Sequence, residues 1–251
     1  MEDKNANSLE TKIWQAKIDL AAILRTAARL GLNEGVDNHF SCLVPGKKDR
    51  FLINPHRRHW QEVSASDIVE VDYNGVPSKG QIPPEATAFF IHSRIHLNCP
   101  DAFCVLHTHM RYATALTMLE NARVEPAVQG ALKFYGQIEY YDEFGGLALD
   151  ESEGDRLAKA LSNKRILFMA NHGILIAGKS IAHAFNDLYY LEQVCRAQVT
   201  ALSTGMPLKR IPQDVAQQTF EQMQLDRDDQ AYHHFAAMKR ILDREEPEYA
   251  S

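Results

Sequence analysis

The stretch FCVLHTHMRYATA, from Phe103 to Ala115, organises the rest of the chain. Its apolar start predicts a buried strand, and a strand sends alternate side chains to the same face. We therefore expect His107 and His109 to project together at the strand end. Because neutral imidazole nitrogens bind zinc and other first-row divalent ions, the pair could form half of a metal site. The alternative is two polar residues at a strand edge with hydrogen-bonded rings.

The length, composition and charge indicate which class of protein this is and which kind of partner it binds. With 251 residues the chain can bury one substantial core, and we predict a single domain over residues 1–251 with a helical C-terminal extension over about 206–251. Apolar residues make up 45% of the sequence and charged residues 24%, the balance of an ordinary globular protein. The formal net charge is −6, and basic residues cluster only in short runs such as Lys47-Lys48. This argues against nucleic acid and favours a small-molecule substrate.

The sequence also predicts a compartment. The N-terminal residues MEDKNANSLE are polar and have no apolar h-region, and no run approaches the roughly 20 apolar residues that cross a bilayer. We expect a cytoplasmic protein that does not enter a membrane. Because we expect no export, we expect reduced thiols at the four cysteines, which share no Cys-x-x-Cys spacing, namely Cys42, Cys99, Cys104 and Cys195.

Hydrophobic periodicity predicts alternating helices and short strands. Helices are expected over residues 9–32, 84–97, 151–161, 180–202 and 229–242, with another from residue 112. Strands are expected over residues 40–44, 51–53, 68–72, 103–106, 165–170 and 174–177. The first three strands should form an antiparallel meander, whereas the glycines of residues 126–146 predict irregular structure.

Several polar residues lie where predicted elements begin or end. Asn38 could form a turn or bind a ligand, and Glu85 could cap the helix that it precedes or act in a site. His56, Arg57 and Arg58 follow a strand and could make an anion pocket or a solvated basic loop.

Three other histidines are candidates for metal ligands. His172 and Gly173 follow the buried strand over 165–170, so a third imidazole could meet the first two at a strand end. His92 and His96 are four residues apart on a predicted helix and could pair on a metal. No third ligand lies near them in the sequence, so we predict that they pack against the sheet.

Together these segments resemble the class II aldolase/adducin family over roughly residues 14–205. The resemblance implies an α/β protein, a three-layer α/β/α sandwich around a mainly antiparallel sheet, assembled as a homotetramer with active sites at subunit interfaces. It also implies a divalent metal, commonly zinc, with manganese and iron as alternatives, held by His107, His109 and His172. The matching segments are Asp37–Ser41, Pro84-Glu85, Leu106–His109 with Ala113–Ala115, and Asn171–Gly173.

The resemblance further implies a reaction type. A metal chelated by substrate oxygens stabilises an enediolate, which makes carbon–carbon cleavage feasible. In the family's sugar-phosphate aldolases the glutamate that matches Glu85 moves the proton. The expected function is a metal-dependent lyase, an aldolase or a decarboxylase, acting on a small hydroxy- or oxo-acid or a sugar-derived substrate. Asn38, His56 and Arg57 are the expected substrate-binding residues, with Arg57 or Arg58 reading a carboxylate.

Two departures from the sugar-phosphate members narrow this expectation. The loop of His56, Arg57 and Arg58 stands where those members have small residues that hold phosphate, and Pro83-Pro84 stands where they have a serine pair before the glutamate. Both argue against sugar-phosphate specificity. The tyrosine that some aldolases lend from a neighbouring subunit falls near Gly130, and other tyrosines could substitute for it, namely Tyr135, Tyr140 and Tyr141.

Two other functions stay open on the same scaffold, because a fold does not fix a reaction. One is an epimerase or oxygenase that uses the same metal site. The other is a non-catalytic, adducin-like interaction module. Retention of all three histidines and of Glu85 argues against that module, since a scaffold has no chemical need for them.

Overall fold

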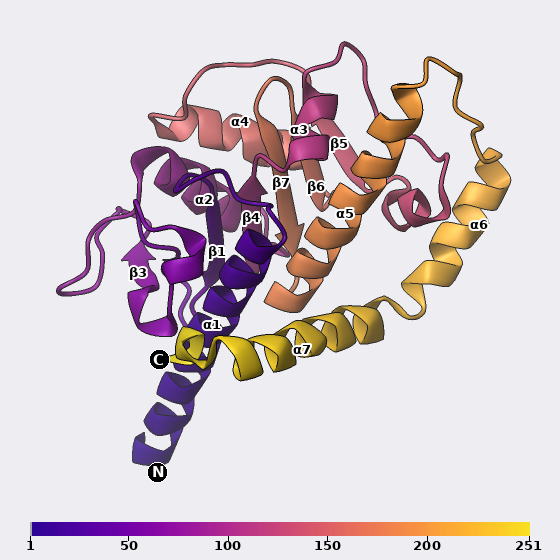
Figure 1. Ribbon diagram of the computed structural model, residues 1–251. Helices are drawn as coiled ribbons and strands as arrows, with labels where there is room; N and C mark the ends of the chain where they lie inside the picture. Colours follow the sequence, from indigo (N-terminus) through magenta and orange to yellow (C-terminus); the bar gives the residue numbers. More distant parts are fainter. Residues whose placement is uncertain (1) are drawn as a thin grey trace.

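The computed structural model describes residues 2–251, with side chains from residue 8 onward. A seven-stranded sheet in the order β3-β2-β1-β4-β7-β6-β5 forms its middle layer (Figure 1). All neighbouring strands are antiparallel except β5 and β6, which confirms a mainly antiparallel sheet. The strands are β1 (His39–Leu43), β2 (Arg50–Ile53), β3 (Val69–Asp72), β4 (Cys104–Thr108), β5 (Ile138–Tyr141), β6 (Ile166–Met169) and β7 (Gly173–Gly178).

Helices cover both faces of the sheet, as the three-layer prediction requires (Figure 1). One face packs against α1 (Glu2–Arg29), α3 (Arg111–Thr117) and α5 (Ile181–Leu202). The other packs against α2 (Ala86–Asn98) and α4 (Glu151–Leu161). In β4, Leu106 belongs to the core on the first face and Val105 to the core on the second. By strand alternation, His107 therefore faces the α2 and α4 layer.

Local signals account for several helix ends. The predicted cap of α5 is confirmed, because the Ser180 side chain accepts a hydrogen bond from the His183 backbone N–H. The predicted stop after α1 is also present, with Gly31 at a φ of 68°. In α4, a Cβ on Gly154 would collide with the carbonyl oxygen of Phe90 in α2. This glycine lets the two helices lie against each other.

The chain ends in two further helices, α6 (Gln213–Gln224) and α7 (Arg227–Glu245), followed by a 3-10 turn over Pro247–Ala250. Residues 206–251 are thus largely helical, although α6 was not predicted. Helix α7 packs against α5 and α1. The buried Arg25 of α1 bonds to Glu246 at 3.1 Å and to Glu248 at 2.7 Å, which ties the chain end to the first helix.

One prediction for the middle of the chain is confirmed only in part. Residues 126–146 were expected to be irregular, but they contain a 3-10 helix over Gln129–Phe134 and the strand β5. Strand β5 lies at the edge of the sheet and pairs in parallel with β6. Residues 126–128, residues 135–137 and the segment from β5 to the start of α4 lie outside any helix or strand.

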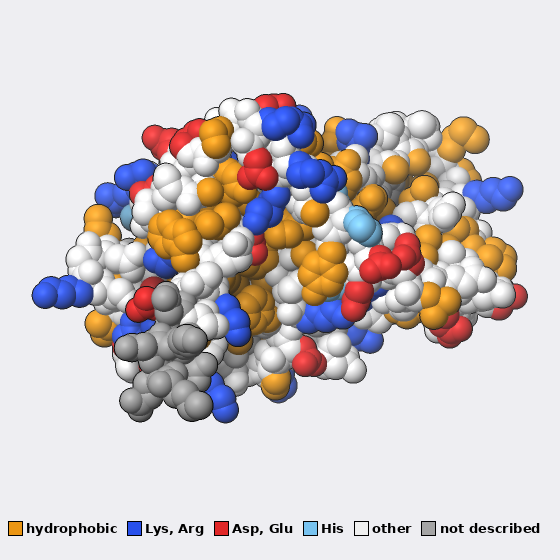
Figure 2. All heavy atoms as spheres, turned by 90° about the horizontal axis from the view of Figure 1, so that it is seen from below, with side chains coloured by type: hydrophobic (Ala, Val, Ile, Leu, Met, Phe, Trp, Pro, Cys, Tyr) orange, Lys and Arg blue, Asp and Glu red, His pale blue; other side chains and the backbone are white. Residues whose placement is uncertain are grey.

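The surface carries charges of both signs. Figure 2 shows acidic and basic side chains mingled with apolar patches on the face seen from below. Within residues 2–251, none of the helices combines the length and the hydrophobicity that a bilayer crossing requires.

Candidate metal centre

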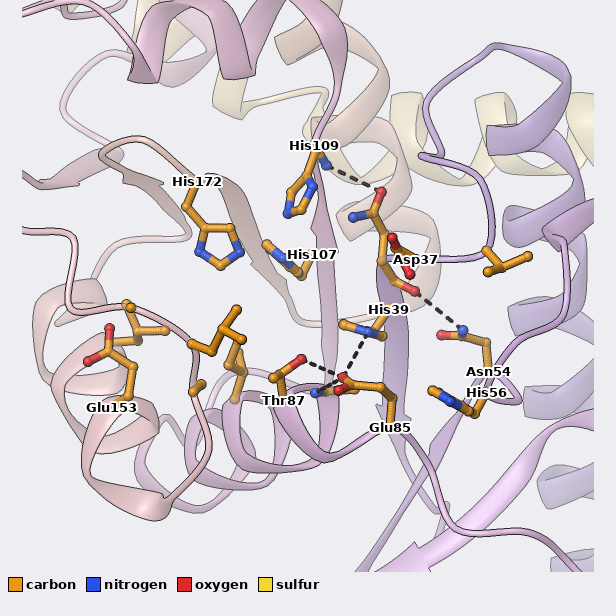
Figure 3. Close-up of a pocket in the computed structure, with 18 of the residues that line it drawn as sticks. Asp37, His39, Asn54, His56, Glu85, Thr87, His107, His109, Glu153 and His172 are labelled. Carbon is orange, nitrogen blue, oxygen red and sulfur yellow. Dashed lines mark hydrogen bonds and ion pairs between the residues drawn. The ribbon is translucent and has the colours of Figure 1, made fainter.

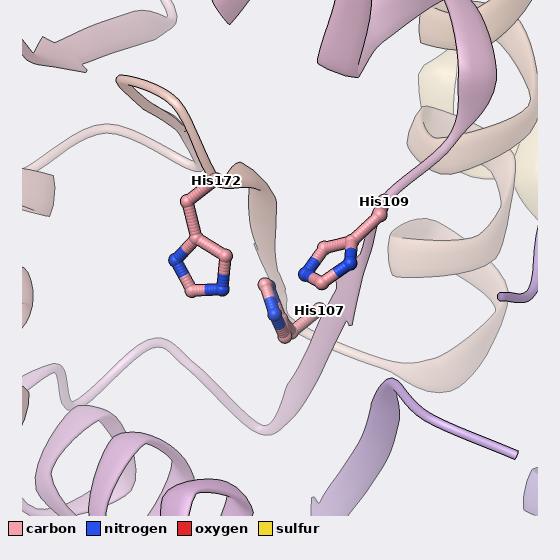
Figure 4. A group of neighbouring side chains, drawn as sticks. All are labelled: His107, His109 and His172. Atoms are coloured by element: carbon pink, nitrogen blue, oxygen red, sulfur yellow. The ribbon is translucent and has the colours of Figure 1, made fainter. Parts of the chain in front are cut away.

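Three histidines from two strand ends converge at one point (Figure 4). His107 lies in β4, His109 follows that strand, and His172 lies in the connection from β6 to β7. One ring nitrogen of each lies within 4.8 Å of those of the other two. The ring centroids of His107 and His172 are 4.7 Å apart, and each of those rings is 5.0 Å from His109. The structure therefore brings together the three residues predicted as metal ligands.

Sheet register explains why residues distant in sequence meet here. Strands β4 and β7 are antiparallel neighbours in which Thr108 pairs with Ile174. The end of β4 therefore meets the start of β7, where His172 lies two residues before Ile174. Gly173 makes the approach possible, because a Cβ there would lie 2.7 Å from the His109 ring and 2.9 Å from the Thr108 carbonyl oxygen.

The ring orientations leave nitrogens available for a metal. His107 Nδ1 donates to the Ile174 carbonyl oxygen at 3.0 Å, which leaves its Nε2 with a free lone pair. His109 Nδ1 bonds to a carboxylate oxygen of Glu34. Its Nε2 is buried and has no hydrogen-bond partner among the described residues. An unpartnered buried imidazole nitrogen facing two others fits a divalent cation, and a carboxylate behind a histidine is a common support for such a ligand.

The site also favours the neutral form of its histidines. Burial, followed by the nearby His109, lowers the pKa of His172 to about 4. Burial lowers the pKa of His107 well below its ordinary value, and His172 and His109 lower it further. Neutral imidazole is the form that binds metal, so no proton has to be removed from these two rings near neutral pH.

The histidines line a cavity of about 580 Å³. This volume is ordinary for a small-molecule site. Figure 3 shows the three rings together, with Asn54 and His56 on one side of the cavity and Glu153 on the other. Glu85 and Thr87 lie across the cavity from these three histidines.

Glu85 caps the helix that follows it and also lines the cavity. Its side chain caps α2 by accepting from the Ala88 backbone N–H at 2.9 Å, and the Thr87 hydroxyl donates to the same oxygen. That oxygen also lies 3.6 Å from His39 Nε2. Partial burial raises the pKa of Glu85, but the bonds from Thr87 and Ala88 outweigh it, so the pKa is lower than usual. The cavity therefore contains an ionised carboxylate that can accept a proton.

His39 is a residue of the cavity that was not predicted as functional. It pairs with His107 across strands β1 and β4, and the two rings stack with centroids 5.9 Å apart. Its Nδ1 is buried without a hydrogen-bond partner in the described chain. The alternation of polar His39 and Ser41 with apolar Phe40 and Cys42 was a signal for it, because it places His39 on the face of β1 that carries the polar residues.

Asn38 supports the turn that leads to this strand. It has a φ of 76° and is 1% exposed, and its Oδ1 accepts from the backbone N–H groups of Glu34 at 3.1 Å and His109 at 3.4 Å. Its Nδ2 is buried without a partner in the described residues, and Asn38 lines the cavity. It therefore holds His109 in place and has a donor left for a ligand.

The basic loop after β2 enters the cavity only in part. His56 lines the cavity, whereas Arg57 and Arg58 are absent from its lining among the described residues. Arg57 is exposed, with a φ of 60°, and Arg58 pairs with Asp67 at 3.3 Å. The structure thus does not bring Arg57 together with the histidines, and its contact with substrate stays a prediction.

His92 and His96 pack in the core, as expected. Ser41 Oγ lies 2.6 Å from His92 Nδ1 and 2.8 Å from His96 Nε2. Since His96 Nδ1 donates to the Ala102 carbonyl oxygen at 2.8 Å, its Nε2 accepts the Ser41 proton and Ser41 in turn accepts from His92. These bonds use both nitrogens of His96, and the pair does not form a second cluster of metal ligands among the described residues.

Solved structures share this architecture. An aldolase II superfamily protein from Pseudomonas syringae is 32% identical in sequence, with a TM-score of 0.89 and 96% of each chain covered. The L-fuculose 1-phosphate aldolase from Glaciozyma antarctica PI12 is 25% identical, with a TM-score of 0.84 and coverage of 96% of this chain and 94% of that one.

Sequence comparison agrees with the structural match. The decarboxylase NovR from Streptomyces niveus is 30% identical over 205 residues, which span 81% of this chain and 73% of NovR. The family described as Class II Aldolase and Adducin N-terminal domain matches residues 18–199. With its three converging histidines and its mainly antiparallel sheet, the chain belongs to the class II aldolase/adducin family.

Proposed function

We propose that the protein is a metal-dependent carbon–carbon lyase, of the aldolase or decarboxylase type, acting on a small hydroxy- or oxo-acid or a sugar-derived substrate. The observation that carries the proposal is the convergence of His107, His109 and His172 in a cavity that also contains an ionised glutamate. The names of two relatives, an aldolase and a decarboxylase, support this class of reaction.

His107, His109 and His172 would hold the divalent ion. Zinc is our first choice because a set of three neutral imidazoles suits it, and manganese and iron are the alternatives. The bound ion would supply Lewis acidity, which polarises a substrate oxygen and stabilises negative charge there. Glu34 would keep His109 oriented through the bond to its Nδ1.

Glu85 would move the proton. Its carboxylate oxygen faces the cavity, is ionised, and is held in place by the Thr87 hydroxyl and the Ala88 backbone N–H. A carboxylate fixed in this way can accept a proton from a substrate hydroxyl or carbon and return it later in the reaction. His39, 3.6 Å from the same oxygen, would restrict the carboxylate to this position.

The remaining predicted site residues would orient the substrate. Asn38 would donate from its unpartnered Nδ2, and His56 would contact the substrate from the loop after β2. Arg57 would reach a substrate carboxylate only from outside the present cavity lining. We also propose a cytoplasmic homotetramer, the assembly that the family resemblance implies.

A substrate screen tests the proposal. The zinc-loaded protein would be incubated with small hydroxy- and oxo-acids, and release of carbon dioxide or aldehyde would be measured. Glu85→Gln should keep its zinc and lose turnover by about 100-fold or more, whereas the exposed Glu10→Gln should match wild type. If the protein loaded with zinc, manganese or iron cleaved no hydroxy-acid, oxo-acid or sugar-derived compound, the result would contradict a lyase and direct attention to protein partners.

A further inference from the structure

The cavity has two chemically different ends on either side of the three histidines (Figure 3). The end formed by β1, the loop after β2 and the start of α2 is polar, with His39, Asn54 and His56. The opposite end is formed by α2, α4 and the irregular segment between β5 and α4.

The side chains at that opposite end are mainly apolar. Ile91, Ala148 and Leu157 are all buried and belong to one hydrophobic cluster that continues into the core. Phe144 and Leu147 complete the wall from the irregular segment, where they are 56% and 74% exposed. A ligand that reaches this end would therefore be bordered by a buried apolar floor and would cover two exposed apolar side chains.

The apolar end of the cavity is close to the three histidines. The Phe144 ring lies 6.5 Å from the His172 ring, measured between centroids. One small molecule could therefore place oxygen atoms at the histidines and a second group against Phe144.

The charges of the cavity disfavour a phosphate in that second position. Among residues 2–251, the cavity lining contains no lysine or arginine, but it contains Asp37, Glu85 and Glu153. A phosphate at the apolar end would find no lysine or arginine in the described lining to pair with, and its charge would lose hydration against apolar side chains.

Glu153 is the acidic residue at the apolar end, but it does not make that end polar. Glu153 is 8% exposed and is paired with Arg156, whose Nε lies 2.8 Å from Glu153 Oε2. Gly145 packs directly over this carboxylate, since a Cβ there would lie 2.9 Å from Oε2. The negative charge of Glu153 is thus already paired with Arg156. The apolar side chains therefore form the surface that a ligand would contact at this end.

From this arrangement, and resting on the proposed function, we propose that the substrate carries a metal-chelating pair of oxygens at one end and an uncharged apolar group, such as an aryl ring, at the other. The apolar group occupies the end bordered by Ile91, Phe144, Leu147 and Leu157. Phosphorylated substrates are excluded from it.

Three 2-hydroxy acids that share one head and differ in their tails test this substrate class. Lactate has a methyl tail, phenyllactate an aryl tail and 3-phosphoglycerate a phosphate tail. After zinc binding has been titrated, calorimetry measures the affinity of the zinc-loaded protein for each. Phenyllactate should bind about tenfold more tightly than lactate or better, and 3-phosphoglycerate no more tightly than lactate.

The outcomes separate this inference from the proposed function. Failure of the titration to show binding of zinc, manganese or iron would remove the proposed function itself. With zinc bound, tighter binding of 3-phosphoglycerate than of phenyllactate, or equal binding of phenyllactate and lactate, would overturn the apolar-tail assignment and leave the metal site standing.

Variants at the exposed Phe144 locate the tail without disturbing the core. Phe144→Ala should weaken phenyllactate binding about tenfold and leave lactate unchanged. Phe144→Arg should shift the preference towards 3-phosphoglycerate. Leu149→Ala is the matched control, because Leu149 is an exposed apolar residue of the same segment that is absent from the described cavity lining. Phenyllactate affinity that is equal in wild type and Phe144→Ala would contradict the placement.

Discussion

A carboxylate oxygen of Glu34 bonds to Nδ1 of His109, and the Nε2 on the other side of that ring is buried without a partner in the described chain. The bond fixes the ring so that Nε2 faces His107 and His172. The glutamate precedes β1 and the histidine follows β4, so the contact joins two segments that meet only in the folded protein.

Removal of this support should weaken metal binding. We expect Glu34→Ala to lower zinc affinity by about 10- to 100-fold, the usual effect of losing a partner behind a metal-binding histidine. A competition titration with a chelating dye measures it. Glu120→Ala, at an exposed glutamate away from the cavity, should bind zinc like wild type. An unchanged affinity in Glu34→Ala would show that His109 does not need this partner.

The hydroxyl of Thr87 should set the pH dependence of turnover. This hydroxyl donates to Glu85 and helps to hold the pKa of that carboxyl low. Thr87→Val removes the donor, so the pKa of Glu85 should rise and the acid limb of the kcat/KM profile should move to higher pH. Thr87→Ser keeps a hydroxyl and should keep the wild-type profile. Profiles that coincide for Val and wild type would argue against Glu85 as the base.

The buried His96 should make the protein sensitive to acid. Burial lowers the pKa of His96 to about 4 from an ordinary value of 6.5. Between these pH values the unfolded chain binds a proton that the folded chain does not, so the free energy of unfolding falls as pH decreases from 6.5 towards 4. The loss attributable to this residue is on the order of 3 kcal/mol. Urea unfolding across this range should show a shallower pH slope for His96→Gln, and equal slopes would contradict the account.

The ion pairs of Arg25 should matter more than those of Arg29. Arg25 has a side chain only 6% exposed and also donates to the Val63 carbonyl oxygen at 2.8 Å. We expect Arg25→Met to reduce the free energy of unfolding by about 2 kcal/mol, less than for a fully buried pair because Glu248 is exposed. Arg29→Met, at a more exposed pair, should cost less than about 1 kcal/mol. A larger effect at Arg29 in urea unfolding would refute this ranking.

Much of the fold could be predicted because its signals are local. The predicted helix over residues 151–161 has the observed bounds of α4, and the predicted meander of the first three strands is present. Strand β5 was missed because it has four residues, lies between glycine-rich segments and depends on pairing with β6. Helix α6 was missed because its residues are mainly polar and only Ala216 is buried, which leaves no wide apolar stripe.

The candidate site likewise contains some residues that the sequence could identify and others that it could not. His107, His109 and His172 could be identified because each follows or ends a strongly apolar strand. Glu34 could not, since its contact with His109 spans 75 residues and leaves no local pattern. Arg57 was expected from the loop's charge, but its positive φ and its exposure are set by the chain path, which charge alone does not reveal.

Metal content is the most direct test of the account. Elemental analysis of the purified protein, after zinc is supplied and excess is removed, should find about one divalent ion per chain, as three converging ligands predict. His107→Ala should lose it, whereas His233→Ala, at an exposed histidine of α7, should retain it, with circular dichroism confirming that both variants are folded. A folded wild-type protein that binds no zinc, manganese or iron, or a His107→Ala variant that binds as much metal as wild type, would contradict the three-histidine metal centre.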